Sequence, residues 1–236
     1  MGVYRQHVSI SEELKDMAIA DIGLSVAFAI LLSGGIFSSV SKGFSLLYLL
    51  PITFMAVTLS FLPHEYMHKK VAERFGIIAA FKRSDFGIIV ALFTSMFGFL
   101  MALPGATMLY TNTLTRKQDG YVSIAGPLTN FAIFLLLFAV FYLSNINHNS
   151  YLAIGLWLTL YINIWLSFIN MLPVYPLDGS KILAWNKGVY AALLVTVFVL
   201  LFSLNPGIAI IESMLFSFVL IVVLAKLSTG MLFRPL

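Results

Sequence analysis

Long runs of apolar residues, separated by short polar segments, dominate the pattern of this chain. A helix needs about 20 consecutive apolar residues to cross the hydrocarbon core of a bilayer. The pattern therefore predicts an all-α, multi-pass membrane protein with about six transmembrane helices. Polar turns at 144–150 and 205–207 separate the later helices. We expect the helices near residues 18–40, 46–68, 123–144, 151–172, 189–204 and 207–225.

A further apolar run, residues 86–103, lies between the second and third predicted helices. If it crossed the membrane, the basic residues before and after it would lie on opposite faces. We expect instead a re-entrant, membrane-associated segment over about 84–112 that enters and returns on one side. Gly98, Pro104 and Gly105 permit the bends that this path needs, and residues 106–111 are predicted to form a short strand.

The positions of the basic residues predict how the chain is oriented in the membrane. Of the 14 Lys and Arg residues, all but Lys42 fall on one side of the six-helix arrangement. Cytoplasmic loops are enriched in Lys and Arg, so both termini are predicted to be cytoplasmic, with the cell membrane as the expected location. The net charge of +4 fits loops that lie beside the anionic headgroups of a lipid bilayer. Because the basic residues are dispersed, no nucleic-acid partner is expected.

Composition agrees with a membrane protein and limits the chemistry. The chain is 60% hydrophobic and only 10% charged, whereas soluble domains are about 25% charged. We expect a single integral-membrane domain over residues 1–236, without a cleaved leader, since the first 16 residues lack the pattern of a signal peptide. There is no cysteine, which excludes thiolate ligands, a cysteine nucleophile and disulfides. Any metal must be held by His, Asp or Glu.

The motif His64-Glu65-x-x-His68 lies at the end of the second predicted helix. Two histidines four residues apart share one face of a helix, where one zinc ion can bridge them. Glu65 is turned by about 100° from His64 and can hold a water at the edge of that face. Pro63 directly precedes the motif and removes one backbone donor, so a kink is possible there.

A catalytic zinc usually takes three protein ligands and leaves one position open. Asp178 follows the fourth predicted helix on the same side of the membrane as the two histidines, whereas Glu212 lies near the opposite face. Asp178 is therefore the candidate for the third ligand. The acidic residues in or near apolar runs are Asp21, Asp85, Asp178 and Glu212.

Three motifs in order resemble those of the site-2 protease family of intramembrane zinc metalloproteases. The first is the His64 motif, the second is the run 125–130 (AGPLTN), and the third is the run 170–179 (NMLPVYPLDG). The resemblance covers roughly residues 46–182, which would be the catalytic core. It departs from the family pattern at Met67 and Ser180, where small residues or a second glycine are usual.

The resemblance implies a function and roles for the residues. His64, His68 and Asp178 would bind one zinc ion per chain, and Glu65 would be the general base. Asn170 would lie beside the site, where its amide could steady the substrate backbone or the developing oxyanion. Asn130 would support the packing of the third span.

The remaining polar and small residues receive structural interpretations. Gly126 and Pro127 are expected to set close helix packing and a helix start. Asn163 is expected to form an interhelical hydrogen bond. Asp21 and Glu212 are expected to be interfacial and solvated.

We therefore predict an intramembrane zinc endopeptidase. Its substrate would be a membrane protein, cut in or near a transmembrane helix, and the apolar segment 86–111 would receive or gate it. One alternative is an integral-membrane zinc protease of the prenyl-protein protease type, which takes a glutamate as third ligand. The other is a non-catalytic membrane zinc-binding protein, against which the presence of Glu65 argues.

Overall fold

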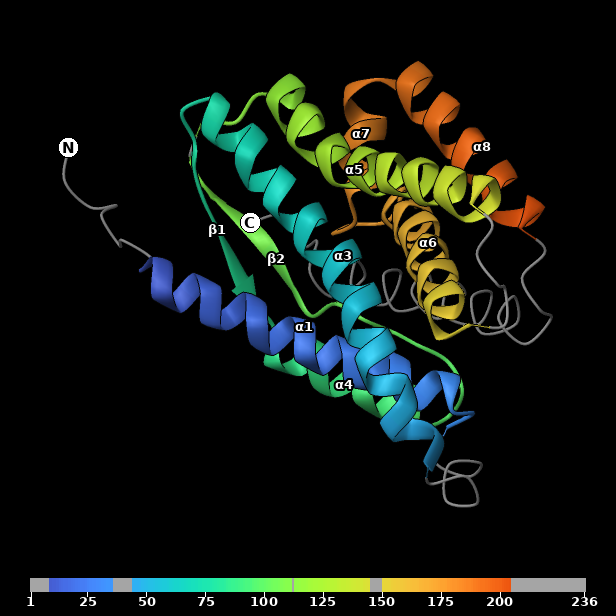
Figure 1. Ribbon diagram of the computed structural model, residues 1–236. Helices are drawn as coiled ribbons and strands as arrows, with labels where there is room; N and C mark the ends of the chain where they lie inside the picture. The colour runs from blue at the N-terminus through green and yellow to red at the C-terminus, as the bar shows by residue number, and fades with distance from the viewer. Residues whose placement is uncertain (1–8, 36–43, 112, 145–149, 205–236) are drawn as a thin grey trace.

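The computed structural model describes residues 9–35, 44–111, 113–144 and 150–204 of the chain. Within these residues the fold is mainly helical, with one small sheet (Figure 1). Its elements are α1 (Ile10–Leu32), α3 (Phe44–Arg74), β1 (Ile78–Arg83), α4 (Asp85–Ser95), β2 (Gly105–Tyr110), α5 (Arg116–Leu143), α6 (Tyr151–Asn170), α7 (Asp178–Trp185) and α8 (Lys187–Ser203).

Helix α3 is the centre of the arrangement. It packs against α1, α5 and α6, and it also touches both strands. In Figure 1 it runs diagonally between α1 on one side and α5 and α6 on the other. The helix continues through Pro51 and Pro63. The elements that carry the functional side chains therefore meet around α3.

Three described helices are long and apolar enough to cross a membrane, in the segments Leu46–Arg74, Arg116–Leu143 and Tyr151–Asn170. They correspond to the predicted second, third and fourth spans, although the first two of them extend beyond the apolar runs into polar sequence. Helix α8 matches the predicted fifth span in position and is a shorter apolar helix of 17 residues.

The other predicted spans stay predictions. Helix α1 begins eight residues before the predicted first span, and its early turns carry several charges, so it is not one of the three long apolar helices. The predicted sixth span, Glu212 and most of the two polar turns lie outside the described residues.

The segment between β1 and β2 leaves the sheet and rejoins it at the same end. Strands β1 and β2 pair in an antiparallel sheet in which Arg83 lies opposite Gly105. Ser84 N donates to Pro104 O at 2.8 Å, which joins the two ends of the excursion. Between them lies α4, whose 11 residues span about 16 Å, only half the thickness of a hydrocarbon core. The segment therefore forms a closed excursion; its depth in a bilayer stays a prediction.

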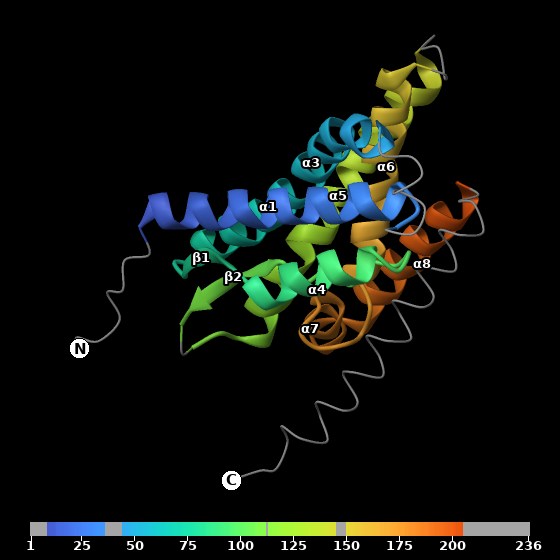
Figure 2. The same cartoon turned by 90° about the horizontal axis from the view of Figure 1, so that it is seen from below.

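The predicted strand over 106–111 is confirmed as β2, one residue earlier. Its partner β1 was not predicted, because a run of six residues with a mixed pattern, IAAFKR, carries no clear period. Helix α4 lies alongside α1, as both Figure 1 and Figure 2 show.

Helix α1 closes the outer edge of β1. The backbone N–H groups of Phe81 and Arg83 donate to Glu13 Oε1 at 3.1 Å and to Asp16 Oδ2 at 3.3 Å. Glu13 is buried and also forms an ion pair with Lys69 of α3, with 2.5 Å between Oε2 and Nζ. One carboxylate thus ties together α1, β1 and α3. A covered strand edge cannot pair with another chain.

The expectation that Asp21 is solvated was wrong. Asp21 is only 3% exposed, because α1 turns this residue towards α3, where Thr58 donates its hydroxyl to Asp21 Oδ2 at 2.6 Å. The interhelical role expected of Asn163 is confirmed, since its Nδ2 donates to Ser60 Oγ of α3 at 2.8 Å. The polar contacts of both side chains therefore hold neighbouring helices to α3.

Glu13→Ala should lower the stability of the fold. The substitution leaves Lys69 without its partner and the Phe81 N–H without its acceptor, at a cost of about 2 kcal/mol. Thermal unfolding of the detergent-solubilised protein would measure the change. Glu12→Ala is the matched control, because Glu12 is exposed and its loss should change little. Equal unfolding temperatures for the two variants would contradict the tie between α1, β1 and α3.

Candidate metal centre

The functional side chains begin with the pair of histidines on α3. His64 and His68 are four residues apart, so their rings lie on one face of the helix, with centroids 4.7 Å apart. Both side chains are buried, with α5 packed against α3 and Asp178 of α7 beside the two rings. Buried imidazoles need polar partners, and the surroundings supply them.

Asp178 joins the pair from the first turn of α7. Its Oδ2 lies 3.5 Å from His64 Nε2 and 3.2 Å from His68 Nε2. One ligand atom from each of the three residues falls within 4.8 Å of the others. The structure thus brings together the three residues that the sequence suggested as ligands.

The chain between α6 and α7 places this carboxylate. Helix α6 ends at Asn170, two residues before the predicted end of the fourth span, and a turn through two prolines leads to Asp178. A Cβ on Gly179 would lie 2.2 Å from Met171 O, so only glycine lets the start of α7 approach the end of α6 this closely. Asp178 therefore sits at the start of a separate short helix, and not at the end of the span.

The other ring nitrogens of the histidines have fixed partners. His64 Nδ1 lies 2.9 Å from Asn130 Oδ1, and His68 Nδ1 lies 2.7 Å from Val122 O, both on α5. Asn130 is itself oriented, because its Nδ2 donates to Ser60 O at 3.3 Å. Both partners of the rings are acceptors, so each Nδ1 carries the proton and each Nε2 is directed towards Asp178.

Three electron-pair donors therefore converge in a buried space. Burial tends to raise the pKa of Asp178, but when the histidines are protonated, their attraction and the hydrogen bonds donated by their Nε2–H groups hold it below its ordinary value. Two imidazole nitrogens and one carboxylate oxygen form a donor set that suits zinc. The group could hold a metal ion, which would satisfy all three donors at once.

Gly126 of α5 keeps this space free. A Cβ at this position would lie 2.4 Å from His68 Nε2 and 2.6 Å from His64 Nε2. Any side chain here would therefore occupy the point on which the donors converge. The sequence favours a role for Gly126 in helix packing, and the structure adds that its missing side chain leaves room at the centre.

Glu65 lies next to this group and contacts the sheet. Its Oε2 accepts hydrogen bonds from Thr107 N at 3.0 Å and from Thr107 Oγ1 at 2.9 Å. The side chain is buried, and it lines a pocket together with His64. Thr107 was not singled out from the sequence, where nothing distinguishes it from the other threonines.

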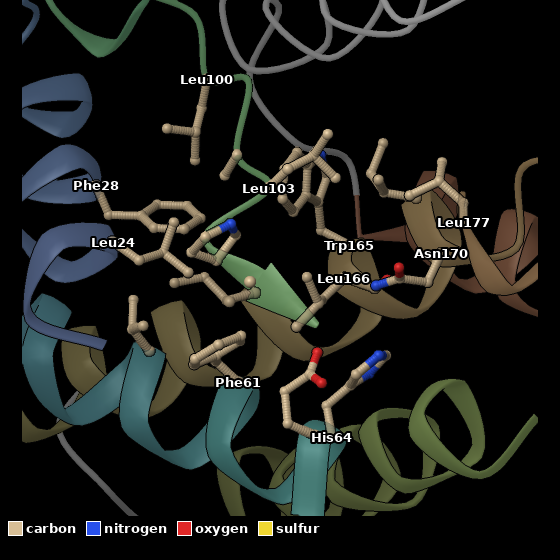
Figure 3. A pocket seen from close by; sticks show the side chains of 17 residues that line it. Leu24, Phe28, Phe61, His64, Leu100, Leu103, Trp165, Leu166, Asn170 and Leu177 are labelled. Carbon is tan, nitrogen blue, oxygen red and sulfur yellow. The ribbon is translucent and has the colours of Figure 1, made fainter. Parts of the chain in front are cut away.

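The pocket connects the centre with apolar surroundings (Figure 3). Phe28 of α1, Phe61 of α3 and Trp165 of α6 line it, as do Leu100 and Leu103 of the segment before β2. Asn170 lines the same pocket, and its Nδ2 donates to Leu166 O of its own helix at 3.0 Å. An apolar segment could therefore lie beside Glu65 and the donor group.

Comparison with known proteins finds relatives in Methanocaldococcus jannaschii. Over 141 residues the chain is 33% identical to MJ0611, which is named as a zinc metalloprotease on a provisional basis. The match covers 59% of this chain and 73% of that protein. Over 132 residues it is 25% identical to the zinc metalloprotease MJ0392, covering 56% of this chain and 33% of that protein. No known family profile matches the chain, and no solved structure matches it.

Gly126→Ala should abolish metal binding. The methyl group would lie against both Nε2 atoms and fill the space that an ion needs. Metal analysis of the purified protein should fall from about one zinc per chain to almost none. Gly155→Ala of α6 is the matched control, because its Cβ would meet the flexible end of Met55 at 3.0 Å and Ile52 at an ordinary contact distance of 3.9 Å. Full zinc content in Gly126→Ala would show that the ion binds elsewhere.

Proposed function

The chain belongs to a family of zinc metalloproteases, and from this premise we propose that it is an intramembrane endopeptidase of the site-2 protease type. It would hydrolyse a peptide bond in or near a transmembrane helix of another membrane protein. One observation carries the proposal: the donor group and Glu65 lie on and around α3, which is long and apolar enough to cross a membrane.

Three residues would hold one zinc ion per chain, namely His64, His68 and Asp178. Bound there, zinc supplies a Lewis acid that polarises a carbonyl and lowers the pKa of a water to about 7. Asn130 and the carbonyl of Val122 would keep the two imidazoles in the orientation that binding requires.

Glu65 would serve as the general base. It follows His64 directly, lines the pocket, and carries a carboxylate that can take a proton from the attacking water and return it to the leaving amine. A role in metal binding or transport alone would need no such group, and this favours an enzyme over a non-catalytic zinc-binding protein.

Asn170 would act on the substrate. It lines the pocket from the end of α6. Its amide group has two N–H bonds, and Nδ2 donates one hydrogen bond to Leu166 O. The other N–H could donate to a substrate carbonyl as negative charge develops on its oxygen.

The substrate would enter as an extended segment. A helix protects its own amides with hydrogen bonds, so a transmembrane helix must unwind locally before it is cut. The apolar pocket extends along residues 100–105, which lead into β2. An extended segment there could pair with the edge of β2 and be recognised mainly through its backbone.

The third ligand separates this proposal from a prenyl-protein protease. That class takes a glutamate, whereas the acid that meets both histidines among the described residues is Asp178. The enzyme would lie in the cell membrane with both termini in the cytoplasm, in line with the distribution of its basic residues.

Glu65→Gln tests the proposal most directly. The substitution keeps the shape of the side chain but removes its basicity, so cleavage of a model transmembrane substrate in liposomes should fall about a thousandfold. Zinc content should stay at about one per chain in both proteins. Zinc without cleavage in the wild type would contradict a protease, and equal cleavage in both proteins would contradict Glu65 as the base.

A further inference from the structure

The two edges of the small sheet have different surroundings. The outer edge of β1 is covered by α1, whose Glu13 and Asp16 accept the N–H groups of Phe81 and Arg83. Phe81 lies opposite Thr107 in the sheet. The N–H of Phe81 points away from β2, and by the alternation of an antiparallel ladder the N–H of Thr107 points away from β1. Thr107 therefore presents its N–H at the open edge.

Glu65 accepts a hydrogen bond from this N–H. Its Oε2 receives both the backbone N–H and the hydroxyl of Thr107, at 3.0 Å and 2.9 Å, and the same hydroxyl lies 3.1 Å from Glu65 O. Among the described residues no such bond is made to Oε1. Two donors on one oxygen hold the carboxylate and leave the other oxygen to act on a proton.

We infer that Thr107 is a positioning residue for Glu65. It acts through Glu65, so the inference rests on the proposed function. A glutamate side chain has three rotatable bonds, and misplacement of a reacting group by about 1 Å can cost a hundredfold in rate. Thr107 removes this freedom by anchoring Glu65 to a strand that is itself held by β1 and α1.

The hydrogen bond between Thr107 N and Glu65 also removes one donor from the open edge of β2. Since Thr107 N is engaged with Glu65, a paired substrate would have to use the N–H groups on either side of it. On one side lies Gly105, which lines the pocket. The position of the base is thereby set relative to the strand edge that would receive the substrate.

Thr107→Val and Thr107→Ser test the anchor by kinetics. Valine keeps the branched shape and the backbone donor but removes the hydroxyl, so we expect kcat to fall about tenfold while KM and zinc content stay unchanged. Serine retains the hydroxyl and should restore most of kcat. Thr111→Val is the matched control, since the hydrogen bonds of the Thr111 hydroxyl within the described part of the chain go to Thr113. Wild-type kcat in Thr107→Val would overturn the inference.

Amide exchange of the metal-free protein provides a readout that does not depend on activity. If Glu65 accepts the Thr107 N–H, Glu65→Ala should increase hydrogen exchange at the Thr107 amide by about tenfold or more. Glu73→Ala, on an exposed part of the same helix, should leave it unchanged. Unchanged exchange in Glu65→Ala would overturn the inference. A wild type that cleaves nothing would instead overturn the proposed function, and exchange would still decide on Thr107.

Discussion

The convergence of His64 Nε2, His68 Nε2 and Asp178 Oδ2 is the interaction on which the rest of the arrangement depends. Three electron-pair donors in a buried space repel one another unless a cation or protons lie between them, and moving a carboxylate out of water is costly. The surrounding fold reduces this cost. Acceptors on α5 orient both rings, and glycines bring α5 and α7 close enough to enclose the space. The packing of α5 and α7 around α3 is therefore tied to one polar cluster.

A second polar chain holds the first in place. Asn163 of α6 donates to Ser60 Oγ, and Asn130 of α5 donates to Ser60 O while accepting from His64. Three apolar helices are thus connected by a few directed hydrogen bonds. Between apolar helices such bonds give a defined register that apolar packing alone supplies less well.

Sequence alone predicted the long helices and the residues of the donor group. Apolar runs of membrane length identify α3, α5 and α6, and the four-residue spacing of the histidines places them on one face. The partners in space were not accessible in this way. The burial of Asp21 depends on which face α1 turns to α3, and the contact of Thr107 with Glu65 depends on the register of β2. Such facts arise from tertiary packing, which no local pattern encodes.

The hydrogen bond between Ser84 N and Pro104 O has a consequence for how the chain can vary. It closes the excursion through α4 at its base, next to the paired positions Arg83 and Gly105. Residues between Ser84 and Pro104 lie outside the ladder, so a change in their number leaves the register of β2 against β1 unchanged. The length of this excursion and the register of the sheet are therefore separable properties.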